Sequence, residues 1–220
     1  MGFRIENNVL IRYQEDRPET EVIIPDGVEI IGRQAFFWSK NLEVLTIPPS
    51  VRIIESDTFK FCRDLKEIRI TEGIETVERY AFQDSWYLKT LKYRDICLPI
   101  TYRYTSTALE MIYQRNCRAS VPDFMKYDII GAIFFYHPED EKLIKYMQKD
   151  FRSVYQSLIV HNQILMLEKI LYSGKFIKQK NIDEIIRCAI ENQSYEIQMM
   201  LINYKNNYLG YQDISDKLKL

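Results

Sequence analysis

A short internal repeat, with a period of 23, is the feature of the sequence that most restricts how this chain can fold. Three segments, which begin at Val22, Leu45 and Ile68, share one pattern of apolar residues. A unit this short cannot bury its own apolar face, so it must stack on copies of itself. The repeat therefore predicts a solenoid. The aligned positions that recur once per repeat are Phe36, Phe59 and Phe82, together with Leu42, Leu65 and Leu88.

Each repeat contains an apolar pair two residues apart, such as Leu45 and Ile47. This spacing turns both side chains to one side of a β-strand, and stacked copies then form a parallel sheet. Gly27 and Gly73 occupy the same turn position, where the absence of a Cβ permits a positive φ. A fourth strand begins at Leu91. We expect three full repeats with flanking strands.

The side chains between the buried pairs face outwards, because successive residues of a strand point to opposite faces. Because the repeat is strictly periodic, they form two ladders across four strands. The sheet face of a solenoid is its usual extended binding surface, although any exposed strand must also meet water. Trp38 and Trp86 lie in turns and are candidate anchors for a partner, or they fill the edge of the solenoid. The predicted partner-binding residues are Glu21, Ile23, Val44, Thr46, Glu67, Arg69, Thr90 and Lys92.

The repeat resembles the BspA-like class of leucine-rich repeats, whose pattern is I-P-x-x-V-x-x-I-x-x-x-A-F-x-x-C-x-x-L. Residues 24–36 match this pattern closely, whereas the third copy has Thr71 in place of Pro and Ser85 in place of Cys. The resemblance covers about residues 1–93, and residues 3–13 resemble the strand pair that often opens such arrays. It implies a right-handed solenoid and a binding role, usually at cell surfaces or in adhesion. The second copy keeps Ile47, Pro48, Val51, Ile54, Phe59, Cys62 and Leu65.

The composition changes after Pro99, where patterns typical of helices replace those of strands. Twelve of the 16 tyrosines lie beyond residue 100. The segments 107–110 and 181–184 resemble capping boxes and predict helix starts. We therefore expect an α+β chain. A leucine-rich repeat solenoid with N-terminal capping strands would occupy residues 1–98, and an α-helical domain would occupy residues 99–220.

A weaker repeat occurs within the helical half. Residues 159–163 align with residues 189–193 at an offset of 30, and each copy reads as helix, short polar turn and helix. This pattern is similar to the helix pairs of ankyrin repeats, although the T-P-L-H signature of that family is absent. We expect ankyrin-like helix pairs at about residues 151–210, stacked so that they cap the exposed end of the solenoid.

The composition argues against several classes of function. Thirty basic and 31 acidic residues give a net charge of −1, which is unlike the basic surplus of a nucleic-acid-binding protein. With two histidines, widely spaced cysteines and no Gly-rich phosphate loop, the sequence predicts no catalytic residue, no metal site and no cofactor. We expect the four cysteines to be small core residues.

These observations predict a non-catalytic protein–protein interaction module with a protein partner of unknown identity. One alternative is a ligand-binding protein or enzyme with a pocket between the helices, near Tyr136, His137 or His161. Another is a fragment of a surface adhesin. No apolar run approaches the ~20 residues of a membrane span, and no signal peptide is visible. We expect a cytoplasmic location, whereas a surface location stays open for a chain whose signal peptide has been removed.

Overall fold

The computed structural model describes residues 2–14, 19–72 and 74–210. The chain divides into two compact units, residues 1–129 and residues 130–220. All strands of the described residues lie before residue 100 and the helices lie after it, so the predicted α+β class is confirmed. The division between the units falls within helix α2 (Asp123–Tyr136), and the domain boundary expected after residue 98 stays a prediction.

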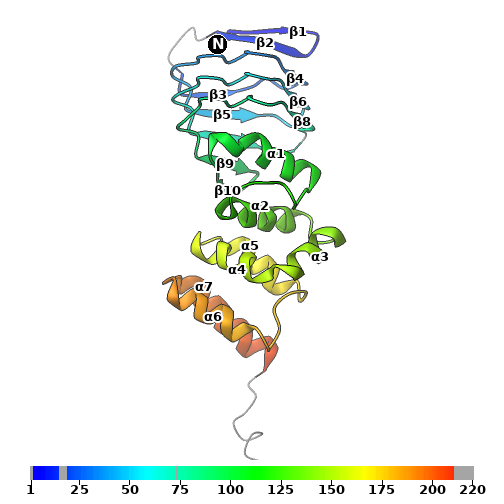
Figure 1. Cartoon of the computed structure of the whole chain (residues 1–220), viewed down its shortest axis with the longest axis vertical. Coiled ribbons are helices and arrows are strands. Elements are labelled where there is room, and N and C mark those ends of the chain that lie inside the picture. The colour runs from blue at the N-terminus through cyan, green and yellow to red at the C-terminus, as the bar shows by residue number, and fades with distance from the viewer. Residues whose placement is uncertain (1, 15–18, 73, 211–220) are drawn as a thin grey trace, which may run out of the picture. The chain divides into compact units, whose positions relative to one another are not determined.

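The apolar pairs of the repeats build a parallel sheet in the first unit (Figure 1). Its strands pair in the register that the repeat requires, so that Glu21, Val44, Glu67 and Thr90 lie side by side. One antiparallel strand extends the sheet beyond the last parallel one. In spatial order the strands are β3 (Glu21–Ile23), β5 (Val44–Ile47), β7 (Glu67–Ile70), β9 (Thr90–Tyr93) and β10 (Ile96–Pro99).

A second sheet is formed by the return arms of the same coils, where a coil is one turn of the solenoid. The predicted N-terminal strand pair is present as an antiparallel hairpin, and the strands that follow it are parallel. The hairpin lies at one end of the stack of strands (Figure 1). The strands in spatial order are β1 (Gly2–Glu6), β2 (Val9–Gln14), β4 (Ile30–Ile31), β6 (Ile53–Ile54) and β8 (Thr76–Val77).

A column of stacked aromatic rings runs through the core of the first unit. The ring centroids of Phe36 and Phe59 lie 5.2 Å apart, and those of Phe59 and Phe82 lie 5.0 Å apart. Tyr13 extends the column, with its centroid 5.0 Å from that of Phe36. Tyr13 precedes Phe36 by one full period of the repeat, so hairpin strand β2 supplies the ring of an additional, incomplete repeat.

The turns of the coils adopt left-handed backbone conformations at two positions that recur in every repeat. Gly27 has a φ of 88°, as its position predicts, and Gly73 lies outside the described residues. Bulky residues adopt the same region, which costs about 1 kcal/mol for a residue with a Cβ. Bonds between coils hold them there: the Trp38 N–H donates to the Lys60 carbonyl at 3.0 Å. The non-glycine residues with φ between 56° and 64° are Gln34, Asp57 and Tyr80, and Trp38, Phe61 and Asp84.

Buried polar side chains at one position of the repeat satisfy backbone carbonyls in the core. The Cys62 thiol donates to the Phe36 carbonyl at 3.0 Å, and the Ser85 hydroxyl donates to the Phe59 carbonyl at 2.6 Å. The two bonds are equivalent in successive coils. Replacement of Cys by Ser in the third repeat therefore preserves the donor that this position needs.

Helix α1 (Thr105–Gln114) packs beside strand β8, at the end of the stack opposite the β1–β2 hairpin (Figure 1). It begins at Thr105, two residues before the predicted start at Thr107, because a 3₁₀ turn at Tyr102–Tyr104 leads directly into it. The Thr105 hydroxyl donates to the Thr101 carbonyl at 3.0 Å. Helix α2 (Asp123–Tyr136) follows and spans the division between the units.

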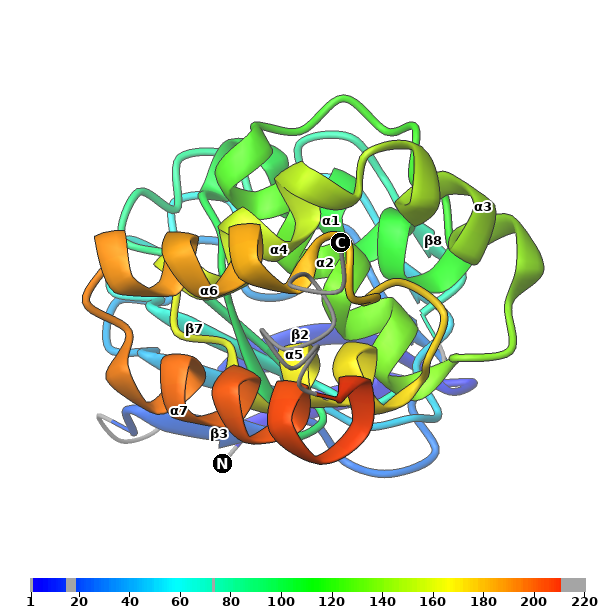
Figure 2. The same cartoon turned by 90° about the horizontal axis from the view of Figure 1, so that it is seen from below.

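The second unit contains helices joined by short turns, except that a longer loop, residues 173–181, joins α5 to α6. Helix α4 contacts α5 and α6, and α7 contacts α5 and α6, so the four helices form two stacked pairs. Helices α6 and α7 run side by side, as the view from below shows (Figure 2). The helices are α3 (Glu141–Lys149), α4 (Phe151–Val160), α5 (Ile164–Tyr172), α6 (Ile182–Glu191) and α7 (Tyr195–Tyr204), followed by a π-helical turn at Lys205–Leu209.

The turn after α6 corresponds to the turn after α4 at an offset of 31 residues, as Gln163 and Ser194 show. The predicted offset of 30 is therefore wrong by one residue. The Gln163 N–H donates to the Leu158 carbonyl, and the Ser194 N–H donates to the Ala189 carbonyl in the second pair. The residue with positive φ is Asn162 in one turn and Gln193 in the other. Aligning the two Asn-Gln dipeptides by identity therefore displaces the copies by a single position.

The start of α6 is where the sequence predicts it, but the capping box is absent. Asn181 precedes the first residue of the helix, yet its side chain caps no helical N–H. Instead its Oδ1 accepts from the Lys178 N–H at 2.7 Å, and its Nδ2 donates to the Phe176 carbonyl at 3.0 Å. Asn181 thus fixes the loop before the helix.

Candidate functional site

The outer sheet face consists of the eight outward residues of β3, β5, β7 and β9. The first ladder is Glu21, Val44, Glu67 and Thr90, and the second is Ile23, Thr46, Arg69 and Lys92. Each of these residues is at least partly exposed, whereas the residues between them are buried. The structure therefore brings all eight predicted residues together on one surface.

Arg69 links two strands of the outer sheet face, β7 and β3. Its Nε lies 2.5 Å from Glu67 Oε1 on its own strand, and its Nη1 lies 3.7 Å from Glu21 Oε2, across strand β5. The hydrogen bond to Glu67 and the two nearby carboxylates raise the pKa of Arg69. The guanidinium is therefore held between the two carboxylates, which it bridges with its single positive charge.

The two ends of the second ladder differ in polarity. Ile23, on the first strand, is 64% exposed. Lys92 lies at the other end, beside Cys97 on β10. Cys97 is exposed and faces the same side, so the prediction that all four cysteines are core residues is wrong for this one. The alternation of β10 explains this, because Ile96 and Leu98 take its buried positions.

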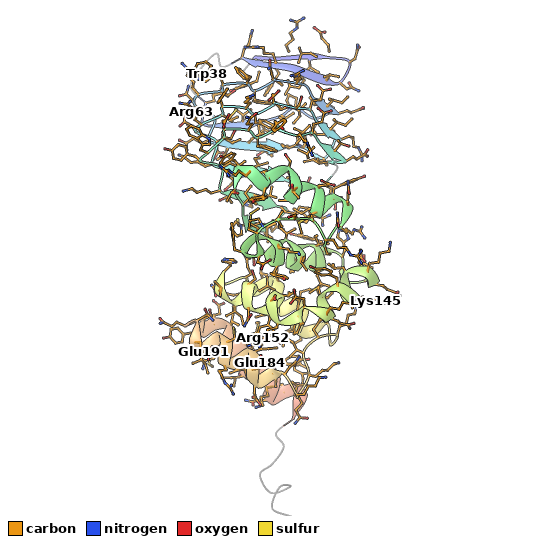
Figure 3. All side chains as sticks on the ribbon, in the orientation of Figure 1. Trp38, Arg63, Lys145, Arg152, Glu184 and Glu191 are labelled. Carbon is orange, nitrogen blue, oxygen red and sulfur yellow. The ribbon has the colours of Figure 1, made fainter. Side chains whose placement is uncertain are left out.

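Trp38 and Trp86 lie in turns, as predicted, with 59% and 52% of their surfaces exposed. Lys40 Nζ lies 5.7 Å from the Trp38 ring centroid, and the Arg63 guanidinium lies 5.2 Å from that of Trp86. Figure 3 labels Trp38 and Arg63 along one edge of the first unit. The two indoles occupy different positions of the repeat, since Asp84 is the equivalent of Trp38 in the third coil. Their role as anchors stays a prediction.

The residues suggested for a helical pocket lie at the ends of two helices, Tyr136 and His137 at the end of α2 and His161 after α4. His137 follows α2, and its Nδ1 is 3.9 Å from Glu139 Oε1. His161 follows the last residue of α4, and its backbone N–H donates to the Ser157 carbonyl. Tyr136 is the last residue of α2. Among the residues that the structure describes, no group of three or more His, Cys, Asp or Glu side chains could hold a metal ion.

Sequence analysis missed a cleft of about 370 Å³ between α4 and α6. Its polar residues are three or four positions apart on each helix, and this spacing in the sequence could have indicated the cleft. Burial and the nearby Glu184 carboxylate raise the pKa of Tyr155 to about 12, and burial and Glu191 raise the pKa of the Cys188 thiol. Both groups are therefore protonated near neutral pH. The lining residues are Arg152, Tyr155, Gln156, Glu184, Arg187, Cys188 and Glu191.

Comparison with protein families agrees with the architecture of the first unit. The family described as the BspA type leucine rich repeat region, in six copies, matches residues 13–108. Residues 13–108 are a BspA-type leucine-rich repeat region. Such regions generally mediate protein interactions or form the repeats of surface proteins. The match ends at residue 108 and gives no support to the ankyrin-like prediction for residues 151–210.

Two solved structures resemble this chain. A leucine-rich repeat protein from Bacteroides capillosus is 23% identical, with a TM-score of 0.31, and the match covers 42% of this chain and 92% of that protein. A leucine rich cell surface protein from Faecalibacterium prausnitzii is 19% identical, with a TM-score of 0.22; the match covers 43% of this chain and 38% of that one. No curated protein matches the sequence. Within residues 2–14, 19–72 and 74–210, no helix has the length and apolar character needed to cross a bilayer.

Proposed function

We propose that the chain is a non-catalytic protein–protein interaction module and that its partner docks on the outer sheet face. The observation that carries the proposal is the register of the two ladders, which presents eight side chains on one surface. A face of this kind is rigid, because its strands are hydrogen-bonded to one another and the residue between the two outward residues of each strand is buried. A rigid surface loses little conformational entropy when it binds a partner.

The polarity of the outer sheet face indicates what the partner presents. Ile23 offers apolar area at one end, and Lys92 offers a cation at the other. These residues are three strand spacings apart, about 14 Å at ~4.8 Å per strand. The proposed partner places an apolar side chain over Ile23 and a carboxylate beside Lys92. Arg69 is already paired with Glu67 and Glu21, so it contributes mainly to shape and orientation.

Replacement of Glu67 and Arg69 by Ala tests this proposal. The two side chains are partly exposed and pair with each other, and exposed ion pairs contribute only about 0–1 kcal/mol to stability. We expect an almost unchanged melting temperature, together with loss of the proteins that the wild-type chain captures from lysate of its source cells. Thermal melts followed by circular dichroism and quantitative mass spectrometry of the captured proteins measure the two effects.

The matched control is Arg52→Ala combined with Glu75→Ala. This pair, with its charged atoms 3.0 Å apart, also removes one cation and one anion, but it borders the second sheet. The control variant is expected to retain the captured proteins. Equal capture by all three chains would contradict the use of the outer sheet face, and marked unfolding of the Glu67 and Arg69 variant would show that these side chains support the core.

We also propose that pairs α4–α5 and α6–α7 are successive units of an ankyrin-like helical repeat. Support comes from the turns, in which the hydrogen bond made by the Gln163 N–H recurs at the Ser194 N–H. The Ser194 hydroxyl also donates to the Ile159 carbonyl at 3.2 Å, which joins the second turn to the end of α4. Such stacking would extend the surface available to a partner.

The cytoplasmic location remains part of the proposal, and the surface adhesin remains its alternative. Both locations are compatible with a protein-binding repeat. Fractionation of the source cells, followed by immunodetection, distinguishes them. Detection of the chain in the surface fraction would favour the adhesin.

A further inference from the structure

The ladder of backbone hydrogen bonds between coils stops at the third coil. The Phe36 N–H donates to the Thr58 carbonyl at 3.0 Å, and the Phe59 N–H donates to the Ala81 carbonyl at 2.7 Å. The N–H of Phe82 occupies the same position of the third coil, but it forms no hydrogen bond with any residue that the structure describes. A 3₁₀ turn and helix α1 replace a fourth coil, so the ladder ends in a donor without an acceptor.

Two further backbone donors of the third coil lack the acceptors that their equivalents have. The Phe61 N–H donates to a carbonyl of the third coil at 3.0 Å, and the Ser56 N–H donates to a carboxylate of that coil at 2.9 Å. One period later, the N–H groups of Asp84 and Arg79 have no partner among the described residues. Because the coils repeat, the N–H groups of Arg79, Phe82 and Asp84, here called the third-coil donors, point towards the end of the solenoid.

A pocket of about 310 Å³ lies at this end of the solenoid, beside the start of α1. Phe82, although only 1% exposed, lines it together with the partly exposed Asp84. Tyr102, Arg103 and Ser106 line the opposite side. The Arg103 Nε donates to the Tyr102 hydroxyl at 3.2 Å, and its guanidinium forms no ion pair within the described ranges. Buried backbone N–H groups without an acceptor are rare in folded proteins, so their position beside a pocket indicates a ligand.

The spacing of the third-coil donors indicates a peptide. In the stack, Ala81 and Gln83 supply two carbonyls to the second coil, and Glu78 supplies the carboxylate. A ligand that continues the ladder must present the same three acceptors, which are a carboxylate and then two carbonyls from alternate residues. A peptide backbone with an acidic residue has this arrangement. In such complexes the main-chain hydrogen bonds supply the affinity, as when a peptide extends the edge of a sheet.

We propose that the end of the solenoid binds a peptide segment of a partner protein, with an acidic residue three positions before the first of two alternate carbonyls. These carbonyls accept from the N–H groups of Phe82 and Asp84, and the acidic side chain accepts from the Arg79 N–H. The positive charge of Arg103 lies beside the segment and favours its carboxylate. This site is separate from the outer sheet face, so it goes beyond the proposed function.

Titration of the full ¹⁵N-labelled chain with a peptide of residues 76–85, blocked at both ends, tests the site. That peptide contains the carboxylate and both carbonyls that the second coil uses. The amide signals of the third-coil donors are expected to shift, with saturation below about 5 mM. Those of Phe59 and Phe61 should stay in place, because their acceptors are present in the free protein. The mirror-image peptide of D-amino acids has the same composition but the opposite handedness, and it should not bind.

Substitutions in the chain and in the peptide locate the contact. Ser106→Trp places a large side chain in the pocket and is expected to weaken binding about tenfold or more. Glu110→Trp, at an exposed position one turn further along α1, is the matched control and is expected to bind as the wild type does. Glu78→Gln in the peptide should also weaken binding, because hydrogen bonds to a carboxylate are stronger than those to an amide.

The proposal is overturned if the third-coil donors show no saturable shift, if the D-peptide binds equally well, or if binding survives Ser106→Trp. The chain with Glu67→Ala and Arg69→Ala is expected to bind the peptide normally. Loss of binding in that variant would show instead that the peptide docks on the outer sheet face, so failure of this proposal is distinguished from failure of the proposed function.

Discussion

Single residues at fixed positions hold successive coils of the first unit together. The rings of Tyr13, Phe36, Phe59 and Phe82 form a column in which neighbouring rings stack at 5.0–5.2 Å. Beside the column, buried donors at the Cys62 position bond to the carbonyl of a neighbouring Phe. Each coil therefore contributes one ring to the core, and the second and third coils each contribute one donor to the coil before it.

Truncation of a central ring is expected to destabilise the first unit strongly. Phe59 is fully buried and stacks on two rings, so Phe59→Ala should lower the free energy of unfolding by about 3–5 kcal/mol. Urea denaturation followed by circular dichroism measures this change. Phe124→Ala, at a ring that is 45% exposed, should cost much less, and equal losses for the two variants would show that the ring column is not the core.

At the scale of elements, the strands of each coil are encoded differently from its turns. A strand is marked by apolar residues two positions apart, whereas the left-handed turn residues include Gln34, Trp38 and Tyr80, which share no side-chain property. Their conformation is imposed by bonds to the next coil, such as that from the Phe61 N–H to the Gln83 carbonyl at 3.0 Å. The turns therefore carry a backbone cost that the stack of coils offsets.

Glycine is expected to relieve this cost where the side chain has no other role. Gln34 is exposed with a φ of 59°, so Gln34→Gly should be more stable than Gln34→Ala by about 1 kcal/mol, because only the alanine Cβ is strained there. Denaturant titration of the two variants measures the difference. Equal stability, or greater stability of the alanine variant, would argue against backbone strain in this turn.

The sequence allowed prediction of the strands, their register and the eight residues of the outer sheet face, because each follows from a strict period. It did not reveal the ring of Tyr13, since the segment around it lacks the rest of the repeat pattern. The offset of the helix pairs was misjudged because Asn162 and Asn192 are identical but occupy different turn positions. The cleft escaped prediction because its charged residues read as ordinary exposed helix faces.

At the scale of the whole molecule, the first unit is modular. Backbone hydrogen bonds join each coil to its neighbours, as from Phe36 to Thr58 and from Phe59 to Ala81. In such an array, the free energy of unfolding is roughly the sum of a contribution from each coil and a contribution from each interface between neighbouring coils. Deletion of a whole coil should therefore leave a folded array, whereas deletion of half a coil should not.

Deletion of residues 45–67 removes one full period and joins Val44 to Ile68, which are consecutive in the pattern. We expect a chain that still unfolds cooperatively, at a lower temperature, because one layer of stacking is lost. Deletion of residues 45–55 removes about half a period and should abolish the folded first unit. Circular dichroism and the indole fluorescence of Trp38 and Trp86 report both results. Equal damage from the two deletions would contradict the modular structure.

The hydrogen bonds between coils also determine the order in which the first unit can form during synthesis. Each coil bonds to residues about one period away, such as Phe36 to Thr58, so the loop that must close is short at every step. The β1–β2 hairpin leaves the ribosome before the coils, and its strand β2 offers a sheet edge on which the first coil can pair. Contacts between residues close in the chain favour rapid folding. Each coil can therefore pair with the coil before it as soon as it has been synthesised.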